Sequence, residues 1–238
     1  MIRAVLFDMD GLIVDSEPIQ FLAFRAFLRE HGHELPESAM SDFVGYHEIE
    51  NMRDLQEKHN LPGLIEDLVT RRRALYLELV KTEPLPVFPG FWELTAEARR
   101  RGLQQAVVSS STREQVEVPL RRVFENHSDT TDPYQHFDAI VTGDDVRASK
   151  PDPEPYLLAA QRLGLDPREC VAFEDTPPGV ASAAGAGVTV YAVPNEYTRH
   201  LEFPGARAVL ATLHQARGHL GGAGGAPLES GAERRRKG

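Results

Sequence analysis

Two aspartates stand in the segment Phe7-Asp8-Met9-Asp10-Gly11, directly after a short apolar run near the start of the chain. Side chains at i and i+2 of an extended segment point to the same side, so the carboxylates of Asp8 and Asp10 are expected to lie close together. Such crowded negative charge is unfavourable without compensation, and a divalent cation is its natural partner. Aspartate is also common in turns, so the pair indicates a functional site only if other polar residues lie beside it.

Three more polar segments follow other apolar runs. The segment Ser109-Ser110-Ser111-Thr112 offers hydroxyls and backbone N–H groups that suit phosphate oxygens, although a plain helix N-cap would use the same residues. Lys150 could neutralise a phosphoryl oxygen or the aspartates themselves. The second acidic pair, Glu174-Asp175, could complete an oxygen cage for Mg²⁺.

An acidic pair, a hydroxyl, a lysine and a second acidic pair are together what a phosphoryl-transfer site needs. An aspartate can attack phosphorus and form an aspartyl-phosphate. Mg²⁺ and a lysine offset the repulsion between the anionic nucleophile and the phosphate. The combination therefore predicts an enzyme that acts on phosphate compounds, provided that the fold brings the four segments together.

The elements that must position these residues are five short apolar runs. They are continuous rather than alternating, which is typical of parallel strands covered on both faces. Helical patterns separate them, such as residues 156–163 followed by Gly164 as a C-cap. The pattern predicts an α/β fold with a doubly wound, Rossmann-like parallel sheet, in which ligands bind beyond the carboxyl ends of the strands. The expected strands are residues 4–7, 106–108, 139–141, 171–173 and 189–193.

Residues 16–83 interrupt this alternation and contain no convincing strand. An apolar helical face is formed by Ile19, Leu22, Ala23, Ala26 and Phe27. A second is formed by Leu64, Leu68, Leu75 and Leu79, on a helix whose outer face, with the arginines at 71–73, is expected to be solvated. We predict a helical cap at 16–83, inserted into a core of residues 1–15 and 84–217, with hinges at 14–18 and 82–89.

The four polar segments resemble the four motifs of the haloacid dehalogenase-like (HAD) hydrolase superfamily. The motifs are FDMDG, the serine at the second strand end, Lys150-Pro151 and FEDTPPG, and they occur in the family's order with plausible spacing. The resemblance covers residues 1 to about 215, and the helical insert resembles that family's small cap domain. The chain is most similar to the branch that contains β-phosphoglucomutase and small sugar-phosphate phosphatases.

The resemblance implies a role for each acidic residue. Asp8 would be the nucleophile and a Mg²⁺ ligand. Asp10 would protonate the leaving oxygen and then activate water, while its backbone carbonyl also binds Mg²⁺. Asp175 would bind Mg²⁺ directly, and Glu174 directly or through water.

The resemblance also implies how the phosphoryl group is held. Ser109 would bind it, helped by the backbone N–H of Ser110, and Lys150 would bridge the phosphate and Asp8. Leu12 and Thr176 differ from the residues usual in the family at their positions, but neither difference removes a required group.

Asp10 discriminates among relatives with different chemistry. Haloacid dehalogenases need no general acid for a halide and usually lack this aspartate. Phosphonatases replace it and use a cap lysine as a Schiff base, whereas the only cap lysines here are Lys58 and Lys81. A retained Asp10 fits an alkoxide leaving group, and hence a small phosphate monoester such as a sugar phosphate or phosphoglycolate.

A β-phosphoglucomutase-type mutase remains the alternative to a phosphatase. The chain shares Gly45 with the mutase pattern but has Glu48 where the mutase has an arginine, and Gln20 where it has a histidine. Both differences favour water as the acceptor. The candidate specificity residues of the cap are Gln20, Phe24, Gly45, Tyr46 and His47.

A non-catalytic signalling or phosphate-binding module is a further alternative. Receiver domains place similar residues at strand ends, but they are about half as long and carry no helical insert. A binding protein would more plausibly have lost Asp8 or Asp10, and both are present.

The composition limits the partners. The 238 residues carry a net charge of −10, which argues against a nucleic-acid surface. A single cysteine, Cys170, excludes an internal disulfide, and no apolar run is long enough for a membrane span. We expect a cytoplasmic monomer that binds Mg²⁺ and a small phosphorylated metabolite, with a flexible glycine-rich tail at 218–238. The segment 125–136 has no functional interpretation.

Overall fold

The computed structural model describes residues 1–43, 48–125, 127 and 132–221. Five parallel strands form one sheet in the order β3-β2-β1-β4-β5. Their bounds are Ala4–Phe7 (β1), Gln104–Val108 (β2), Ala139–Val141 (β3), Cys170–Glu174 (β4) and Thr189–Ala192 (β5). All five predicted strands are therefore confirmed, with ends that differ by at most two residues.

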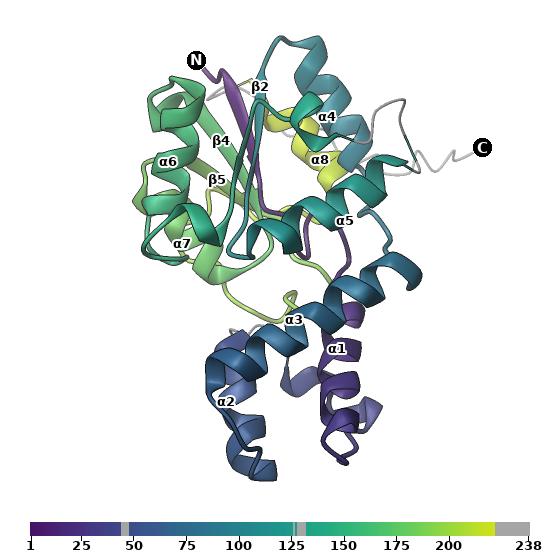
Figure 1. Ribbon diagram of the computed structural model, residues 1–238. Coiled ribbons are helices and arrows are strands. Elements are labelled where there is room, and N and C mark those ends of the chain that lie inside the picture. Colours follow the sequence, from purple (N-terminus) through teal and green to yellow (C-terminus); the bar gives the residue numbers. More distant parts are fainter. Residues whose placement is uncertain (44–47, 126, 128–131, 222–238) are drawn as a thin grey trace, which may run out of the picture.

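Helices cover both faces of the sheet, as the continuous apolar strands require (Figure 1). Helices α4 (Phe91–Arg100), α5 (Arg113–Glu125) and α8 (Leu213–Ala216) lie on one face. Helices α6 (Glu154–Leu163) and α7 (Pro177–Gly185) lie on the other. The predicted C-cap Gly164 ends α6 in the left-handed conformation, with a φ of 68°. The α/β doubly wound prediction is confirmed.

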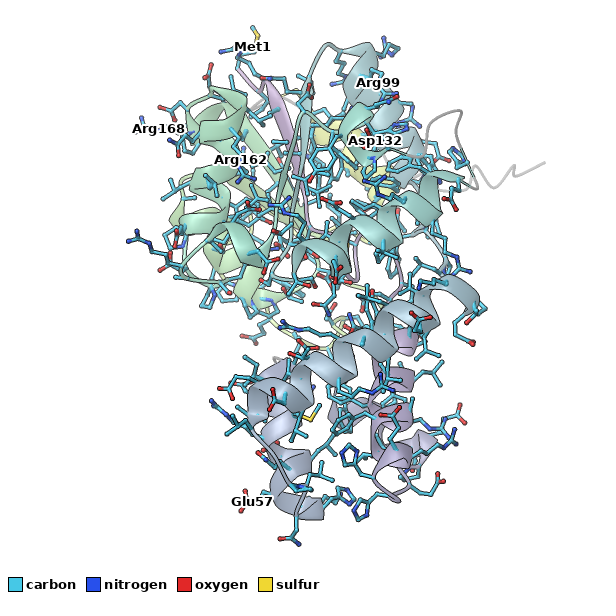
Figure 2. The ribbon with its side chains drawn as sticks, in the orientation of Figure 1. Met1, Glu57, Arg99, Asp132, Arg162 and Arg168 are labelled. Carbon is cyan, nitrogen blue, oxygen red and sulfur yellow. The ribbon has the colours of Figure 1, made fainter. Side chains whose placement is uncertain are left out.

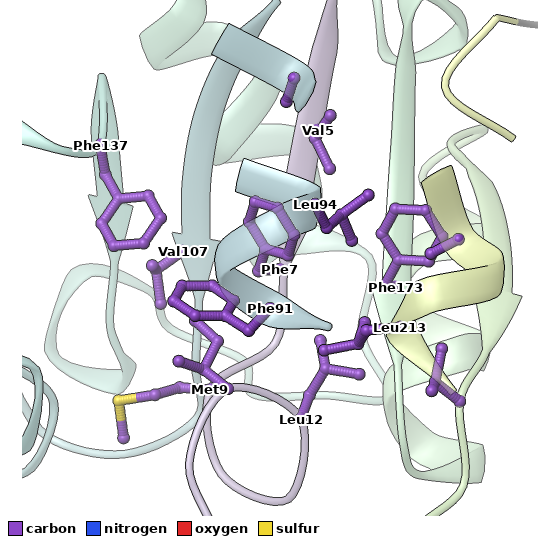
Figure 3. Packing of buried hydrophobic residues seen from close by; sticks show 14 of the residues in the cluster. Val5, Phe7, Met9, Leu12, Phe91, Leu94, Val107, Phe137, Phe173 and Leu213 are labelled. Atoms are coloured by element: carbon purple, nitrogen blue, oxygen red, sulfur yellow. The ribbon is translucent and has the colours of Figure 1, made fainter. Parts of the chain in front are cut away.

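The two faces of the sheet are packed with side chains of different size. On the α4 side, Phe7 packs edge-on against Phe91, with ring centroids 5.8 Å apart, and faces Phe173 at 6.3 Å (Figure 3). On the α6 and α7 side the strands present smaller residues, including Ala106 and Ala172. These small residues let the short alanine-rich helix α7 approach the sheet closely, while the aromatic face fills the wider space beneath α4.

A group of helices lies apart from the sheet, below its carboxyl edge in Figure 1. It consists of α1 (Glu17–Glu30), α2 (Glu48–His59) and α3 (Ile65–Thr82), with a 3₁₀ turn at Glu37–Asp42. Figure 2 places Glu57 at the tip of this group and Met1 at the opposite end of the molecule. Among the described residues of the insert no strand occurs, as the sequence predicts.

The two segments that connect the helical group to the core lie side by side. The backbone N–H of Asp15 donates to the carbonyl of Pro86 at 2.9 Å, and that of Phe88 donates to the carbonyl of Ile13 at 2.9 Å. On the core helix α5, the guanidinium of Arg122 donates to the carbonyls of Val80 and Glu83 at the end of α3. These contacts fix where the helical group begins and ends relative to the sheet.

Two expectations about α3 are wrong. Leu64 precedes the helix and is exposed, whereas Leu68 is buried. The arginines at 71–73 do not form a uniformly solvated face, because the side chain of Arg72 is only 1% exposed. Arg72 lies one turn from both Leu68 and Tyr76, which are buried on the same side of the helix.

The end of the chain also differs from expectation. The flexible tail was predicted to begin at residue 218, but Arg217–His219 forms a 3₁₀ turn and Leu220 is buried against the core. Residues 222–238 lie outside the described residues, as do 126 and 128–131 of the uninterpreted segment 125–136. Within the described ranges no helix has the length and apolar character that a membrane span requires.

Candidate active site

The predicted site residues meet at the carboxyl edge of the sheet. Asp8 follows the central strand β1, Ser109 follows its neighbour β2, and Glu174 ends its other neighbour β4. The chain order reverses between β1 and β4, and such a switch point is where open α/β sheets bind ligands. Residues that are far apart in sequence therefore converge because their strands are adjacent and parallel.

Lys150 connects three of these strand ends. Its Nζ contacts Oδ1 of Asp8 and donates to Oε1 of Glu174 at 2.6 Å and to the carbonyl of Val108 at 2.8 Å. Its side chain is only 6% exposed, so the ammonium is paired almost without water. Burial opposes its charged form, but the carboxylates of Asp8 and Glu174 together raise the pKa of Lys150 above the ordinary value.

Asp8, Glu174 and Asp175 form a compact carboxylate cluster. All three are buried, and one oxygen from each lies within 4.8 Å of the others. Burial raises the pKa of Asp8 well above its ordinary value, and the nearby charge of Lys150 offsets part of this rise. Burial, followed by the negative charge of Asp8, also raises the pKa of Asp175 well above its ordinary value. Such a cluster is unfavourable when ionised, and one lysine neutralises only part of its charge.

The unpaired oxygens of this cluster fit a divalent cation. Oε2 of Glu174 and Oδ1 of Asp175 are buried and have no hydrogen-bond partner among the described residues. Unpaired buried carboxylate oxygens are costly, and Mg²⁺ takes carboxylate oxygens as ligands. Asp8, Glu174 and Asp175 are thus the residues that could hold a metal, while the side chain of Asp10 lies outside the cluster.

Tyr156 and Asn195 hold the cluster in place, and neither was singled out from the sequence. The hydroxyl of Tyr156, on α6, donates to Oε1 of Glu174. Nδ2 of Asn195 donates to Oδ2 of Asp175 at 2.9 Å and to the carbonyl of Gly11 at 3.0 Å. Asn195 lies shortly after β5, and this position past a strand end is the sequence feature that could have predicted its role. The spacing around Tyr156 predicts only an apolar helix face and gives no indication of its contact with Glu174.

Gly11 is required where the first acidic segment turns. Its φ is +81°, a conformation that other residues rarely adopt. A Cβ atom there would lie 2.1 Å from Oδ2 of Asp175 and 2.7 Å from Nδ2 of Asn195. The glycine of the FDMDG segment therefore lets the backbone pass directly beside the carboxylate cluster.

Asp10 has a different environment from Asp8. Ser16 donates to its Oδ1 at 2.6 Å, and Ser111 donates to its Oδ2 at 2.9 Å. Burial raises the pKa of Asp10, while the hydrogen bonds from Ser16 and Ser111 lower it and leave a smaller rise. An aspartate with a raised pKa that is held by two hydroxyls is suited to give and take a proton.

The three serines after β2 have different environments. The side chain of Ser109 is buried, and its Oγ accepts a hydrogen bond from the N–H of Ser111 at 3.1 Å. Ser110 is exposed and lines the same cavity as Asp8 and Lys150. The hydroxyl of Ser111, in contrast, is directed to Asp10, a role that the sequence could not separate from its neighbours.

A cavity of about 720 Å³ lies between this edge of the sheet and the helical group. The core side contributes Asp8, Asp10 and Lys150, and the helical side contributes Gln20 and Phe24, two of the predicted specificity residues. Gly45, Tyr46 and His47, the other three, lie outside the described residues. Residues lining the cavity on the helical side that were not predicted as specificity residues include Glu17, Phe21, Phe43, Glu48, Asn51 and Arg72.

Glu17 begins α1 and lines the cavity beside the catalytic candidates. Burial, followed by the negative charges of Asp10 and Asp15, raises the pKa of its carboxyl to about 7, against a smaller lowering by Arg72. The helical group therefore supplies a titratable group to the cavity as well as apolar surface.

Comparisons with known proteins agree with this geometry. A family model described as a haloacid dehalogenase-like hydrolase matches residues 2–187. Protein CbbY of Rhodobacter capsulatus is 32% identical over 212 residues, which cover 86% of this chain and 91% of CbbY. Hexitol phosphatase A of Escherichia coli strain K12 is 33% identical over 193 residues, which cover 80% and 82% of the two chains.

A solved structure of CbbY from Rhodobacter sphaeroides, in complex with phosphate, has a TM-score of 0.80 and 30% identity. The similarity covers 91% of this chain and 96% of that one. The resemblance that the four motifs indicated is confirmed, and this chain belongs to the haloacid dehalogenase-like hydrolase family.

Proposed function

We propose that the protein is a Mg²⁺-dependent phosphatase that hydrolyses a small phosphate monoester of a sugar or related polyol through an aspartyl-phosphate. The observation that carries the proposal is the pairing of Asp8 with Lys150 within a buried carboxylate cluster that retains two unpaired oxygens. The site faces a cavity large enough for a small metabolite.

In the first step, Oδ of Asp8 attacks phosphorus and the bond between phosphorus and the ester oxygen breaks. Asp10, whose pKa burial raises, gives its proton to the departing alkoxide oxygen. The alcohol leaves, and the phosphoryl group is bonded to Asp8. Ser109 and the N–H of Ser110, which follow β2 at the same edge of the sheet, would hold the phosphoryl oxygens.

In the second step, the carboxylate of Asp10 takes a proton from water, and the water oxygen attacks phosphorus. The bond between phosphorus and Asp8 breaks, which releases inorganic phosphate and restores the free carboxylate. Ser16 and Ser111 keep Asp10 in place through both proton transfers. One residue thus serves as acid and then as base.

Lys150 neutralises charge on Asp8 and on the transferring phosphoryl group. Asp8, Asp175 and Glu174 would hold the metal, together with the backbone carbonyl of Asp10. When bound, Mg²⁺ would offset the negative charge shared by the nucleophile and the phosphate. Tyr156 and Asn195 orient the carboxylates that receive it.

We also propose that residues 16–83 act as a cap that closes over the core, excludes bulk water and selects the leaving group. The cavity between the two parts supports this role, because its lining includes side chains from both. The polar residues and phenylalanine rings of its cap side suit a hydroxyl-bearing carbon chain. The similarity to hexitol phosphatase A supports the same class of substrate.

Release of inorganic phosphate from p-nitrophenyl phosphate and a panel of small phosphate monoesters tests the proposal. We expect turnover with Mg²⁺, none with EDTA, and none in the Asp8→Asn variant. Asp67→Asn is a matched control, because Asp67 is exposed on α3 and does not line the cavity. Loss of activity in the control as well would indicate a general defect of the preparation.

The same panel separates the alternatives. Conversion of β-glucose 1-phosphate to glucose 6-phosphate, without phosphate release, would instead indicate a mutase. Turnover of phosphonates alone would indicate a phosphonatase. A folded protein that binds Mg²⁺ but turns over none of these compounds would contradict the phosphatase proposal and point to a binding role.

A further inference from the structure

The turn that follows β3 contacts the serines that follow β2. It comprises Thr142 and the 3₁₀ turn Gly143–Asp145, and is called the β3 turn below. None of these four residues, all of which the structure describes, lines the cavity. The backbone N–H of Gly143 instead donates to the carbonyl of Ser111 at 2.8 Å. The β3 turn therefore contacts the serine segment, residues 109–111, from outside the cavity.

Gly143 makes this contact possible because it has no side chain. A Cβ atom there would lie 2.4 Å from the carbonyl oxygen of Ser110. That carbonyl and the N–H of Ser111 belong to one planar peptide group, and the N–H donates to Oγ of Ser109 at 3.1 Å. A side chain at position 143 would thus move the donor that orients the Ser109 hydroxyl.

Asp145 holds the β3 turn closed. Its Oδ2 accepts from the backbone N–H and from the hydroxyl of Thr142, each at 2.8 Å. Its Oδ1 accepts from the guanidinium groups of Arg113, on α5, and Arg162, on α6, each at 2.7 Å. Burial opposes ionisation of Asp145, but the hydrogen bonds from Arg162 and Thr142 hold its pKa below the ordinary value. One ionised carboxylate therefore fixes the β3 turn relative to both helices.

Asp144 adds a contact just beyond the serine segment. Its Oδ2 accepts from the backbone N–H of Arg113, the first residue of α5, at 2.8 Å. The β3 turn thus hydrogen-bonds to the backbone at Ser111 and again two residues later. The path of the chain between β2 and α5 is therefore set by contacts outside the cavity.

Resting on the phosphatase function proposed above, we propose that the β3 turn is a brace for the phosphate-binding serine segment, and that Gly143 and Asp145 are positioning residues. Gly143 lets the turn reach the backbone of Ser110 and Ser111, and Asp145 keeps the turn in the form that makes this contact. Both act through the Ser109 hydroxyl and the N–H of Ser110, whose positions determine how tightly a phosphoryl group is held.

Inorganic phosphate is the probe, because it needs the phosphate-binding groups and has no leaving group. Its Ki is measured against p-nitrophenyl phosphate hydrolysis at saturating Mg²⁺. Gly143→Ala crowds Ser110, and Asp145→Asn removes the charge that pairs with Arg113 and Arg162. We expect each variant to raise Ki about fivefold or more and to lower kcat.

The Mg²⁺ requirement and the thermal unfolding midpoint separate positioning from a merely structural role. The Mg²⁺ concentration for half-maximal activity should stay as in the wild type. A merely structural role would lower the unfolding midpoint but leave the Ki of the folded protein unchanged. An unchanged Ki in both variants overturns the proposal, and so does an equal rise in the Mg²⁺ requirement.

A double variant tests whether Gly143 acts through the serine segment. Ser109→Ala removes the hydroxyl that the Ser111 N–H orients. Adding Gly143→Ala to Ser109→Ala should raise Ki by a smaller factor than Gly143→Ala does in the wild type, because part of the interaction is already lost. An undiminished factor contradicts the proposal.

Two variants of Asp144 keep the test decisive if the variants above fail to fold, because this residue is exposed. Asp144→Ala removes the acceptor for the N–H of Arg113 and should raise the Ki for phosphate about twofold or more. Asp144→Asn keeps an oxygen acceptor and should match the wild type. Equal Ki values in all three proteins contradict the proposal.

Asp138→Ala is the matched control. Oδ2 of Asp138 accepts from the backbone N–H of Gln105 at 2.8 Å, so it also connects the chain beside β3 to β2, but at the opposite end of these strands. Its Ki for phosphate should equal that of the wild type, and an equal rise would show that the effect is not specific to the β3 turn.

Hydrolysis of p-nitrophenyl phosphate by the wild type reports on the proposed function separately. If that hydrolysis is absent, the phosphatase proposal fails, and calorimetric titration of inorganic phosphate with Mg²⁺ into the wild type and the same variants tests the brace. Weaker binding in Gly143→Ala and Asp145→Asn than in the wild type supports the brace. Equal binding, or no binding to the wild type, overturns it.

Discussion

The hydroxyl of Ser16 donates a hydrogen bond of 2.6 Å to Oδ1 of Asp10. Ser16 is fully buried and directly precedes α1, so it belongs to the connection between the core and the helical cap. The residue proposed to transfer protons is thereby tied to the segment about which the cap would turn. The proton affinity of Asp10 therefore depends on Ser16, a residue at the hinge.

Ser16→Ala should raise the pKa of Asp10, because the lost hydrogen bond stabilises the ionised carboxylate. A hydrogen bond to a charged group contributes about 1.5–3 kcal/mol, and only that from Ser111 would remain in the variant. The ionisation of Asp10 in the pH profile of kcat should therefore move to higher pH. Ser38→Ala, an exposed serine of the cap, is the control, and identical profiles for both variants would contradict the assignment.

Tyr156→Phe should weaken activation by Mg²⁺. The variant removes the hydroxyl that donates to Oε1 of Glu174 and leaves that carboxylate less well oriented. Loss of a group that orients a metal ligand typically costs about 10–100-fold in metal affinity. The concentration of Mg²⁺ for half-maximal phosphate release should therefore rise about tenfold or more.

Tyr134→Phe provides the control for this prediction. Tyr134 also donates to a glutamate, Oε1 of Glu117 at 2.7 Å, but the residue is 45% exposed and lies away from the cavity. Its Mg²⁺ requirement should be unchanged. An equal shift in the two variants would show that the effect is not specific to Glu174.

Gly179→Ala should disrupt the carboxylate cluster, because a Cβ at this position would lie 2.0 Å from Oε2 of Glu174. Either Glu174 or the start of α7 must move, and we expect at least a 100-fold loss of activity. Gly185→Ala, in the same helix, would place its Cβ 3.6 Å from the nearest atom, on Pro153, which is an ordinary contact. That variant should retain activity, and its stability should be unchanged or higher by about 0.5–1 kcal/mol.

Measurement of phosphate release and of the thermal unfolding midpoint for both glycine variants decides this prediction. Retention of full activity by Gly179→Ala would mean that Glu174 is free to move without consequence for the site.

The sequence predicted the core of the site because its residues follow apolar strands. Asp8 directly follows β1 and Glu174 is the last residue of β4, and neighbouring parallel strands bring their carboxyl ends together. The residues that orient the acidic side chains of the site were not predicted, and the reason is physical. Asn195 reaches Asp175 across 20 residues, and Ser111 reaches Asp10 across 101, so these contacts depend on loop paths that no local periodicity encodes.

The burial of Arg72 was missed for a different reason. Three consecutive arginines were read together as a solvated surface, although Leu68, Arg72 and Tyr76 share one face of α3 by their spacing of four. The rotational position of each arginine, rather than the composition of the run, decides which is buried. Glu48 and Gln20 then make that burial possible by pairing with the charge.

Glu17 should make the protein less stable as pH rises through the neutral range. Its pKa is about 7 in the folded protein, mainly because of burial, against an ordinary value of 4.5. The folded state thus binds the proton more tightly than the unfolded chain, so this contribution is complete below about pH 4.5 and is lost between there and about pH 7. The loss amounts to up to about 3 kcal/mol in the free energy of unfolding.

Glu17→Gln cannot lose that contribution, because its amide stays neutral at every pH. Urea unfolding at pH 5 and pH 8, in EDTA, should therefore show a smaller decrease in the free energy of unfolding for the variant than for the wild type. The difference isolates Glu17, since the other buried carboxylates titrate in both proteins. Glu66→Gln, an exposed glutamate on α3, should behave like the wild type. The same pH dependence in wild type and Glu17→Gln would mean that the carboxyl of Glu17 keeps an ordinary pKa, with water or a cation reaching it inside the cavity.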